Sequence, residues 1–429
     1  MPSFDLVDQP WLPCVRRGGE ATELGLRHAL LDAHELRELY DPSPLATVAL
    51  HRLLLAVLHR AYAGPGDAAA WRAIWSAGRF DPAVVDAYLE RWRHRFNLFD
   101  PDRPFYQVPF LADLADPTKQ TPVAKLAQEA AAGNNATLFD HSVDSDPMSL
   151  PPASAARAVV ATQAFSIGFG RSAPFYLSDS TLIRGYSVLA EGDSLFETLA
   201  LNLMPYNRDR PMPWLDDDRP CWEQELPPTP DRAGTPVAGY ADYLTWQSRQ
   251  IHLVSDAGGA TVARCQLRQN LKLSAPPLDP FKCYRKDEQR GWRPRSFRPQ
   301  RALWRDSTML FAQLGGGRAG ESSRPQVLDW LAQVEQQRQF GQIAAKPLYR
   351  LRGFGLTTDD GNAASVVLWR REELPLPMAI LDQPRAVAAI AEAIAFAEEV
   401  HTALGRGVRR VATLLLSEMA DQPGARQPD

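Results

Sequence analysis

A long amphipathic segment near the C-terminus is the feature that most constrains the architecture. Between Pro384 and Met419 apolar side chains recur at spacings of three and four residues, at Val387, Ile390, Ile394, Ala397, Leu404, Val408, Val411 and Leu415. This spacing predicts one helix of about ten turns with a single apolar stripe. A lone helix cannot bury such a stripe, so it must pack on the body, on a partner subunit, or on helices that this sequence does not contain.

The rest of the chain predicts an irregular mixture of helices and strands. Its 36 prolines and 11 tryptophans favour many turns between short elements, with bulky side chains beneath them. Residues 45–62 carry a broad apolar stripe typical of a helix, and helical spacing is also expected over 32–39. Residues 243–254, 261–273 and 347–377 are typical of paired strands. The expected fold is α+β: a large, irregular mixed α/β N-terminal domain followed by an abbreviated C-terminal helical segment.

The composition excludes several classes of protein. The formal net charge of −4 argues against general coating by nucleic acid, although it permits a local basic face. No apolar run reaches the roughly 18 residues of a membrane span, and the N-terminus MPSFDLVDQPW lacks a signal pattern, so we expect a cytoplasmic protein without membrane contact. The four cysteines form no CxxC pair, which predicts neither a zinc site nor a disulfide framework.

The stretch SIGFGRSAPF, residues 166–175, contains two glycines, and the local sequence does not determine their function. A dinucleotide-binding fingerprint needs a third glycine where Ala173 stands, and Pro174 interrupts the chain just beyond it. The GKS or GKT of a phosphate-binding P-loop does not occur. We therefore expect no nucleotide cofactor, and the stretch is either a tight turn or a loop that contacts nucleic acid.

The most basic part of the chain is FKCYRKDEQRGWRPRSFRPQRALWR, residues 281–305. It holds nine cations and two acids, with Tyr284, Trp292, Phe297 and Trp304 between them. This mixture favours neutralisation of a nucleic-acid backbone with stacking on bases or ribose. The alternative is a solvated loop whose arginines pair with acidic groups elsewhere.

An enzyme is the main rival class. The acidic cluster of Asp140, His141, Asp144 and Asp146 could hold the divalent metal of a nuclease. It lies in a loop of small residues, and no second ligand cluster, nucleophile elbow or HExxH motif completes a site. We therefore expect no catalytic residue and no bound metal.

Several stretches, in order and at family spacing, resemble the CasA family, the large subunit of type I-E CRISPR Cascade surveillance complexes. The resemblance begins at FDLVDQPWLPC, continues through FDPDRPFYQ, TQAFSIGFGRSAPF, YLTWQSRQIHL and NAASVVLWRREELPLP, and covers residues 4 to about 415. It implies an N-terminal domain over 1–377 and, over 378–429, the first helix of a reduced or truncated four-helix bundle. Family members usually continue for several more helices, and the polar tail ADQPGARQPD favours a natural short form.

The resemblance implies a protein without catalysis of its own. Such a subunit reads the PAM, a short motif on double-stranded target DNA, and helps to open the duplex so that crRNA pairs with one strand in an R-loop. It also helps to recruit the effector nuclease-helicase of antiviral defence. The expected partners are crRNA, other Cascade subunits, double-stranded DNA and that nuclease-helicase. The alternative is a nucleic-acid-binding scaffold that does not read the PAM.

The resemblance assigns a first DNA contact to the glycine stretch. In the family a glycine loop lies in the minor groove of the PAM, where glycine lets the backbone come close. The matching residues here are Gly168, Phe169, Gly170 and Arg171. The arginine is added because a cation in a narrow minor groove is electrostatically favoured.

Two further DNA contacts are carried over. A lysine finger enters the same groove from a hairpin tip, and its match is Lys282, with Arg285 or Lys286 as alternatives. A glutamine wedge parts the base pairs beyond the PAM, but the aligned residue is Ala363, which lacks the length and the amide of glutamine. Either Asn362 substitutes for it, or other contacts open the duplex.

A polar loop over residues 133–141 corresponds to the family segment that touches the 5′ end of the crRNA and a neighbouring subunit. Asn134 and Asn135 would supply hydrogen bonds there, and Phe139 one aromatic anchor. The alternative is a surface loop without order in the free subunit.

Overall fold

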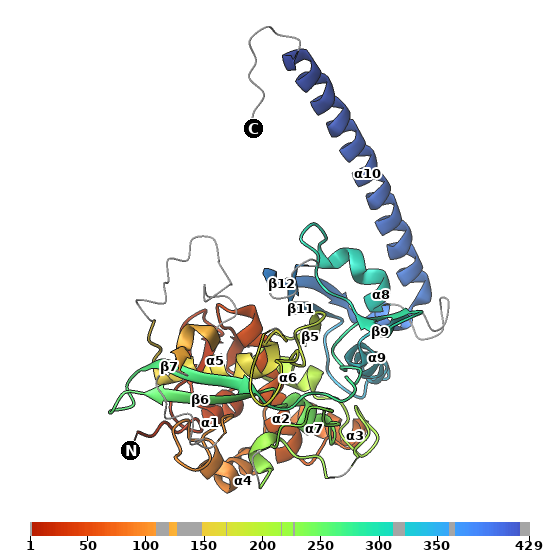
Figure 1. The fold of residues 1–429 in the computed structure, drawn as a ribbon. Coiled ribbons are helices and arrows are strands. Elements are labelled where there is room, and N and C mark those ends of the chain that lie inside the picture. Colours follow the sequence, from red (N-terminus) through yellow and green to blue (C-terminus); the bar gives the residue numbers. More distant parts are fainter. Residues whose placement is uncertain are drawn as a thin grey trace.

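The computed structural model describes residues 2–108, 120–126, 148–168, 170–215, 217–225, 228–311, 322–359 and 365–420, with side chains as far as residue 417. Helices and strands are mixed along this part of the chain (Figure 1), which confirms the predicted α+β class. The helices are α1 Leu26–Leu31, α2 Pro44–Ala61, α3 Ala68–Ala77, α4 Pro82–Trp92, α5 Pro152–Phe165, α6 Leu195–Asn202, α7 Tyr240–Leu244, α8 Ser307–Phe311, α9 Gln326–Gln339 and α10 Pro384–Ala420. The strands are β1 Leu12–Arg16, β2 Ala21–Leu24, β3 Leu36–Leu39, β4 Thr121–Pro122, β5 Ser187–Glu191, β6 Arg249–Ser255, β7 Val262–Gln269, β8 Tyr284–Asp287, β9 Gly291–Pro294, β10 Ser322–Ser323, β11 Leu348–Thr358 and β12 Val366–Pro377.

Helix α2 forms the centre of the body, as the apolar stripe over 45–62 predicts. Pro44 begins the helix, and the Ser43 side chain caps it by accepting a hydrogen bond from the Ala46 amide. Every side chain from Leu45 to His59 is buried. The helix packs against α4, α5, α6, α7 and the β11–β12 hairpin, so its polar side chains have to find partners inside the protein.

The buried guanidinium of Arg52 links α2 to the beginning of the basic segment. Its Nη1 lies 2.9 Å from Oδ2 of Asp279, and the two side chains are 3% and 0% exposed. The Tyr243 hydroxyl donates a hydrogen bond to the same carboxylate oxygen, and the Phe281 amide donates to the other. The Arg52 guanidinium also lies over the rings of Tyr243 and Phe281. These contacts hold the chain after residue 279 against the core.

The strands of the described residues form four antiparallel three-stranded sheets, in the orders β2-β1-β3, β10-β8-β9, β12-β11-β5 and β4-β7-β6. The expected strand pairs are confirmed as the hairpins β6–β7 and β11–β12. The helix expected over 32–39 is wrong, because Leu36–Leu39 forms β3. Its backbone pairs with β1, with Leu39 opposite Cys14, and both leucines are buried. Pairing with β1 therefore overrides the helical spacing.

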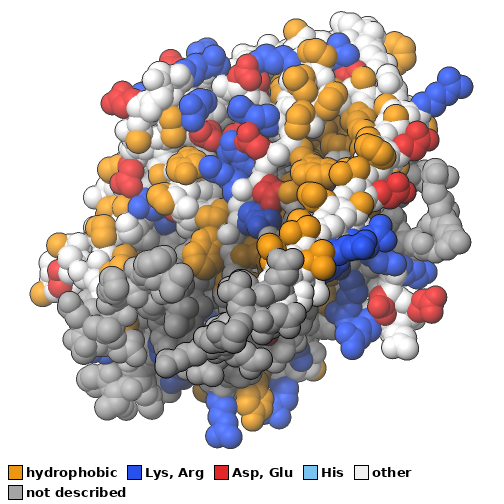
Figure 2. All heavy atoms as spheres, turned by 90° about the horizontal axis from the view of Figure 1, so that it is seen from above, with side chains coloured by type: hydrophobic (Ala, Val, Ile, Leu, Met, Phe, Trp, Pro, Cys, Tyr) orange, Lys and Arg blue, Asp and Glu red, His pale blue; other side chains and the backbone are white. Residues whose placement is uncertain are grey.

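Helix α10 confirms the long helix that the stripe predicts, and it extends away from the body (Figure 1). Its first turns contact α8 and the short helix Met378–Asp382, and Val387 and Ile390 pack on the edge of the core. Farther along, Phe396 and Leu404 are 68% and 66% exposed. Figure 2 views the molecule from the side toward which α10 extends, and it shows hydrophobic side chains gathered on that side. The body therefore covers only the beginning of the stripe.

The division into domains at residues 377 and 378 stays a prediction. Within the described residues, no helix combines the length and the apolar character needed to cross a membrane.

The buried pair of Arg52 and Asp279 generates a prediction about stability. The Asp279→Asn substitution leaves a buried guanidinium without a carboxylate, so we expect the free energy of unfolding to fall by roughly 3–5 kcal/mol. Denaturant unfolding followed by circular dichroism measures this loss. The control is Asp217→Asn, which breaks an exposed ion pair with Arg219 and is expected to cost less than about 1 kcal/mol. Equal losses in the two variants would contradict the role given to the buried pair.

Candidate nucleic-acid interface

The glycine stretch begins a loop whose two ends are joined at its base. Helix α5 ends at Phe165, and the Ser180 amide donates a hydrogen bond to the Ser166 carbonyl at 2.9 Å. The Ser166 amide donates in return to the Ser180 hydroxyl at 3.1 Å. That hydroxyl lies 2.6 Å from the hydroxyl of Ser248, just before β6. All three serines are buried, so the base of this loop, residues 166–180, is part of the core.

The two glycines of the loop have different surroundings. A Cβ added to Gly168 would lie 2.3 Å from the backbone nitrogen of Asp179, so this position tolerates no side chain. The Gly168 amide donates a hydrogen bond to the Asp179 carboxylate at 2.7 Å. Gly170 is exposed with φ at +107°, and a Cβ added there would meet no atom within 4 Å. Gly168 thus closes the loop, and Gly170 faces open space with a backbone that favours glycine.

A buried arginine that the sequence analysis did not select holds both arms of the loop. The Nη2 of Arg249, at the beginning of β6, donates hydrogen bonds to the carbonyls of Ile167 and Ser178 at 3.1 and 2.7 Å. Its Nη1 donates to the Ser248 carbonyl and to the Gln269 side chain. Burial lowers the pKa of this arginine to about 10. A signal was present in the sequence, because Arg249 shares the strand phase of the inward-facing Ile251 and Leu253.

Lys282 lies in the core, so the expectation that it stands at a hairpin tip is wrong. Its side chain is 3% exposed, and its Nζ donates hydrogen bonds to the carbonyls of Thr181 and Arg184 at 2.9 and 2.6 Å. Burial lowers the pKa of the ammonium to about 8. Lys282 is held inside because its neighbours Phe281 and Cys283 are also buried. It fixes the chain that leaves the glycine loop against the beginning of the basic segment.

The basic segment divides into an exposed hairpin and an ion-paired second half. Strands β8 and β9 form the hairpin, and Arg285 and Lys286 are exposed on β8. In the second half, Arg295 and Arg301 both pair with Asp306. The pairing of Arg295 and Arg301 with an acid agrees with the second interpretation for these two arginines, and binding of nucleic acid by the segment stays a prediction.

Several expected residues lie outside the described part of the chain. They are Phe169 of the glycine loop, Asn362 and Ala363 of the wedge, Asn134, Asn135 and Phe139 of the crRNA loop, and the acidic cluster Asp140, His141, Asp144 and Asp146. Their roles stay predictions. Among the residues that are described, no group of three or more histidine, cysteine, aspartate or glutamate side chains is placed to hold a metal ion.

Comparison with known proteins decides the family. The sequence model for CRISPR-associated protein Cse1 matches residues 5–426. The chain belongs to this family. A CasA/Cse1 protein of Thermus thermophilus is 34% identical over 423 residues, which cover 96% of this chain and 78% of that protein. The resemblance to the CasA family is therefore confirmed.

Solved structures of Cse1 proteins share the fold of this family member. Cse1 of Acidimicrobium ferrooxidans is 28% identical with a TM-score of 0.79, and the match covers 94% of this chain and 77% of that one. A chain in a structure described as a CRISPR RNA-guided surveillance complex is 27% identical with a TM-score of 0.78, and the match covers 99% of this chain and 85% of that one.

The contacts of Arg249 generate a prediction about loop dynamics in this Cse1-family chain. The Arg249→Lys variant keeps the charge but cannot reach all four acceptors, so the arms of the loop should separate more often. We expect amide hydrogen exchange over residues 166–182 to become at least about tenfold faster, which corresponds to about 1.4 kcal/mol. Exchange within α2 should stay unchanged. The exposed Arg264→Lys variant on β7 serves as the control, and exchange as slow as wild type in both variants would contradict the clamp.

The burial of Lys282 generates a prediction about pH. Its pKa is about 8 in the folded protein against an ordinary 10.5, so between these values the unfolded chain binds the proton and the folded protein does not. The loss of folding stability that this lowered pKa causes is largest below pH 8 and disappears as pH rises. We expect the stability of wild type relative to Lys282→Met to rise by roughly 2 kcal/mol between pH 7.5 and 9.5. Urea unfolding at several pH values measures it, and a constant difference would contradict the buried ammonium.

Proposed function

We propose that this chain is the non-catalytic large subunit of a type I-E Cascade complex and that it reads the PAM of double-stranded target DNA. Family membership and the likeness to a chain of a CRISPR RNA-guided surveillance complex support its assembly with crRNA and other Cascade subunits. In this proposal the complex acts in the cytoplasm in antiviral defence. The chain helps the crRNA to form an R-loop and helps to recruit the effector nuclease-helicase.

The glycine loop is the observation that carries the PAM assignment. Gly170 is exposed with open space where a side chain would stand, on a base held by hydrogen bonds from Arg249 and by the hydrogen bond that the Ser166 amide donates to the Ser180 hydroxyl. The minor groove of B-DNA is only about 6 Å wide, so a stretch of backbone without a side chain reaches the base edges most easily. The exposed Arg171 supplies a cation beside it.

The cation from the neighbouring hairpin is assigned to Arg285 or Lys286. Both are exposed on β8, whereas the buried Lys282 is committed to two backbone carbonyls. Lys282 supports the contact indirectly, because it ties the arm of the glycine loop to the residues from which this hairpin begins. The two elements proposed to contact DNA are thereby joined at their bases.

Duplex opening is assigned to the turn between β11 and β12. The Asp359 amide donates a hydrogen bond to the Ser365 carbonyl at 2.9 Å, which closes the hairpin just below residues 360–364. The alanine at position 363 has no group that reaches between base pairs. Opening therefore relies either on Asn362 or on other contacts of the complex.

The PAM assignment is tested with the reconstituted crRNA complex and duplexes that carry a randomised PAM. Without this subunit, the preference for PAM over non-PAM duplexes should disappear. The Gly170→Asp variant should lower that preference at least about tenfold, because a side chain and a negative charge keep the loop out of the groove. The Gly170→Ala variant adds the same backbone strain without the charge and should lower it less.

A matched glycine separates a local effect from general damage to the fold. Gly19 in the β1–β2 turn has φ at +90° and open space around it, so Gly19→Asp introduces similar strain and the same charge. Its PAM preference should equal that of wild type. Selectivity that survives in Gly170→Asp would show that the loop does not read the PAM. Selectivity that survives removal of the whole subunit would favour the scaffold function, with binding through the basic segment alone.

A further inference from the structure

Tyr176, in the second arm of the glycine loop, is an exposed aromatic side chain. It is 67% exposed, whereas the ring of Phe175 directly before it is buried. Within the part of the chain that the structure describes, neither its hydroxyl nor its ring has a hydrogen-bond or ring partner. The contacts proposed for Gly170 and Arg171 do not involve it. The face of the tyrosine ring is therefore open to a further partner.

The backbone of the loop places Tyr176 beside Gly170. The Leu177 amide donates a hydrogen bond to the Gly170 carbonyl at 3.2 Å, so the two arms of the loop lie next to each other at this level. Residues joined in this way have Cα atoms about 5 Å apart, and Tyr176 directly precedes Leu177. Base pairs follow one another at about 3.4 Å along a duplex. With Gly170 in the minor groove, the tyrosine ring is therefore within reach of a neighbouring base step.

A buried glutamine holds the loop on both sides of Tyr176. Gln269, the last residue of β7, is fully buried. Its side-chain oxygen accepts a hydrogen bond from the Ser178 amide at 2.6 Å, and its side-chain nitrogen donates to the Ser178 hydroxyl at 2.9 Å. Its backbone amide donates to the Ser172 hydroxyl at 2.9 Å. The backbone that carries the exposed ring is thus fixed before and after it.

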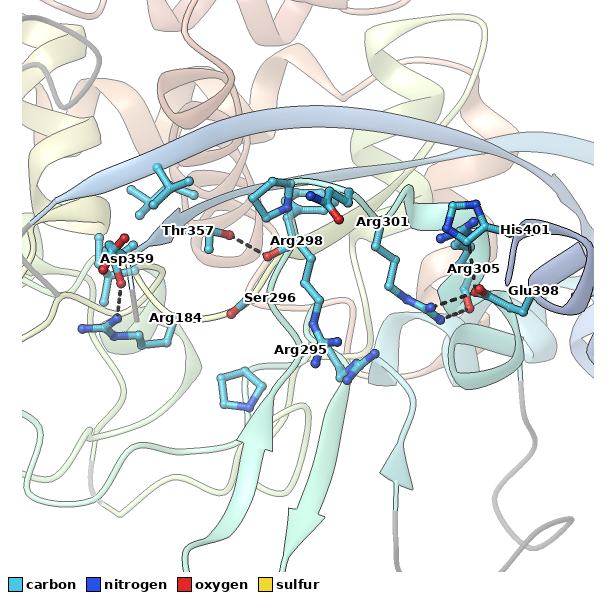
Figure 3. A pocket seen from close by; sticks show the side chains of 18 residues that line it. Arg184, Arg295, Ser296, Arg298, Arg301, Arg305, Thr357, Asp359, Glu398 and His401 are labelled. Atoms are coloured by element: carbon cyan, nitrogen blue, oxygen red, sulfur yellow. Dashed lines mark hydrogen bonds and ion pairs between the residues drawn. The ribbon is translucent and has the colours of Figure 1, made fainter. Parts of the chain in front are cut away.

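The base of the loop is also joined to the β11–β12 hairpin, next to the turn to which duplex opening is assigned. The Asp179 carboxylate accepts hydrogen bonds from the Gly168 amide and from Nε of Arg184, both at 2.7 Å. Nη1 of Arg184 donates to the hydroxyl of Thr358, the last residue of β11, at 2.8 Å. Figure 3 shows Arg184 at this end of the hairpin, close to Asp359, where the turn begins. The tyrosine arm and the turn therefore belong to adjoining parts of the surface.

An aromatic ring at this place has the chemistry that duplex opening requires. Proteins that bind the minor groove insert apolar side chains between base pairs, which partly unstacks and kinks the duplex. The face of an aromatic ring also stacks on the base that becomes exposed, which replaces part of the stacking that the bases lose. The hydroxyl of tyrosine keeps the tip of the side chain compatible with water before DNA binds. Ala363 in the turn offers neither a ring nor the length.

We propose that the ring of Tyr176 enters the minor groove beside Gly170 and stacks on the first base pair beyond the PAM, so that this base step parts before the crRNA pairs with it. This role rests on the proposed function, because reading of the PAM by the glycine loop brings the ring to the groove. It adds to that function one of the other contacts on which opening relies. The ring recognises the flat face of a base, so it opens the duplex without reading its sequence.

The test measures the rate of R-loop formation by the reconstituted crRNA complex, at saturating concentration, on a duplex with a PAM selected from the randomised set. A fluorophore and a quencher on the two DNA strands report their separation. Tyr176→Ala should slow R-loop formation at least about fivefold, which corresponds to about 1 kcal/mol, because no ring replaces the lost stacking. Tyr176→Phe keeps the ring and should stay within about twofold of wild type. An unchanged rate in Tyr176→Ala would overturn the proposal.

A pre-opened duplex separates the opening of DNA from general damage to the protein. When the two DNA strands are mismatched over roughly the first three base pairs beyond the PAM, where guide pairing nucleates, the step assigned to Tyr176 is already complete. Tyr176→Ala should then stay within about twofold of wild type. The control is Phe340→Ala, which removes a ring that is 78% exposed at the end of α9 and should match wild type on both duplexes. Equal slowing of Tyr176→Ala on the paired and the pre-opened duplex would overturn the proposal.

Assembly and PAM selection of the Tyr176→Ala complex complete the test. Native gel electrophoresis should show the variant subunit bound to the crRNA complex as wild type is, and a loss of association would overturn the proposal by identifying the ring as a subunit contact. The variant should also select the same PAM sequences from the randomised duplexes, and a changed selection would overturn it too. PAM preference that survives in Gly170→Asp removes PAM reading by the loop. A wild-type rate of Tyr176→Ala on a complex that still selects its PAM removes only the role of the ring.

Discussion

The burial of α2 on every side is the constraint on which the rest of this structure depends. A helix with no solvent-facing side must satisfy its polar groups within the protein, because each unpaired buried charge costs several kcal/mol. Arg52 pairs its charge with Asp279, more than two hundred residues later in the chain, through Nη1, while its Nη2 has no hydrogen-bond partner among the described residues. The ion pair that permits a fully buried central helix is therefore also the contact that places the first residues of the basic segment.

From that anchor, two further buried cations arrange the proposed DNA-contacting surface. Arg249 and Lys282 both bind backbone carbonyls of the glycine-loop region instead of carboxylates. Carbonyl dipoles hold both cations in place, and the carboxylate of Asp179 lies close enough to act on each of them. The cations available to phosphates are therefore the exposed Arg171, Arg285 and Lys286. Support and attraction thus come from separate sets of residues.

Local patterns predicted many elements correctly. The stripes over 45–62 and 384–419 became α2 and α10, and the alternating stretches became the β6–β7 and β11–β12 hairpins. Each of these elements is long enough for its own periodicity to dominate. The helix predicted over 32–39 was wrong because a segment this short takes its conformation from pairing with β1 and not from its own periodicity. The expected family was confirmed because its motifs occur in order along almost the whole chain.

The sequence alone determined which residues carry charge, which lack a side chain, and which apolar stripes had to be covered. Only the tertiary structure decided which charges are available. Lys282 looked like a cation for DNA, yet its acceptors lie 98 and 101 residues away and draw it into the core. Arg249 looked like an ordinary strand residue, yet it holds a loop 71 to 82 residues distant. The spacing of residues along a chain reports local periodicity, whereas the partners of a buried cation are set by the packing of distant elements.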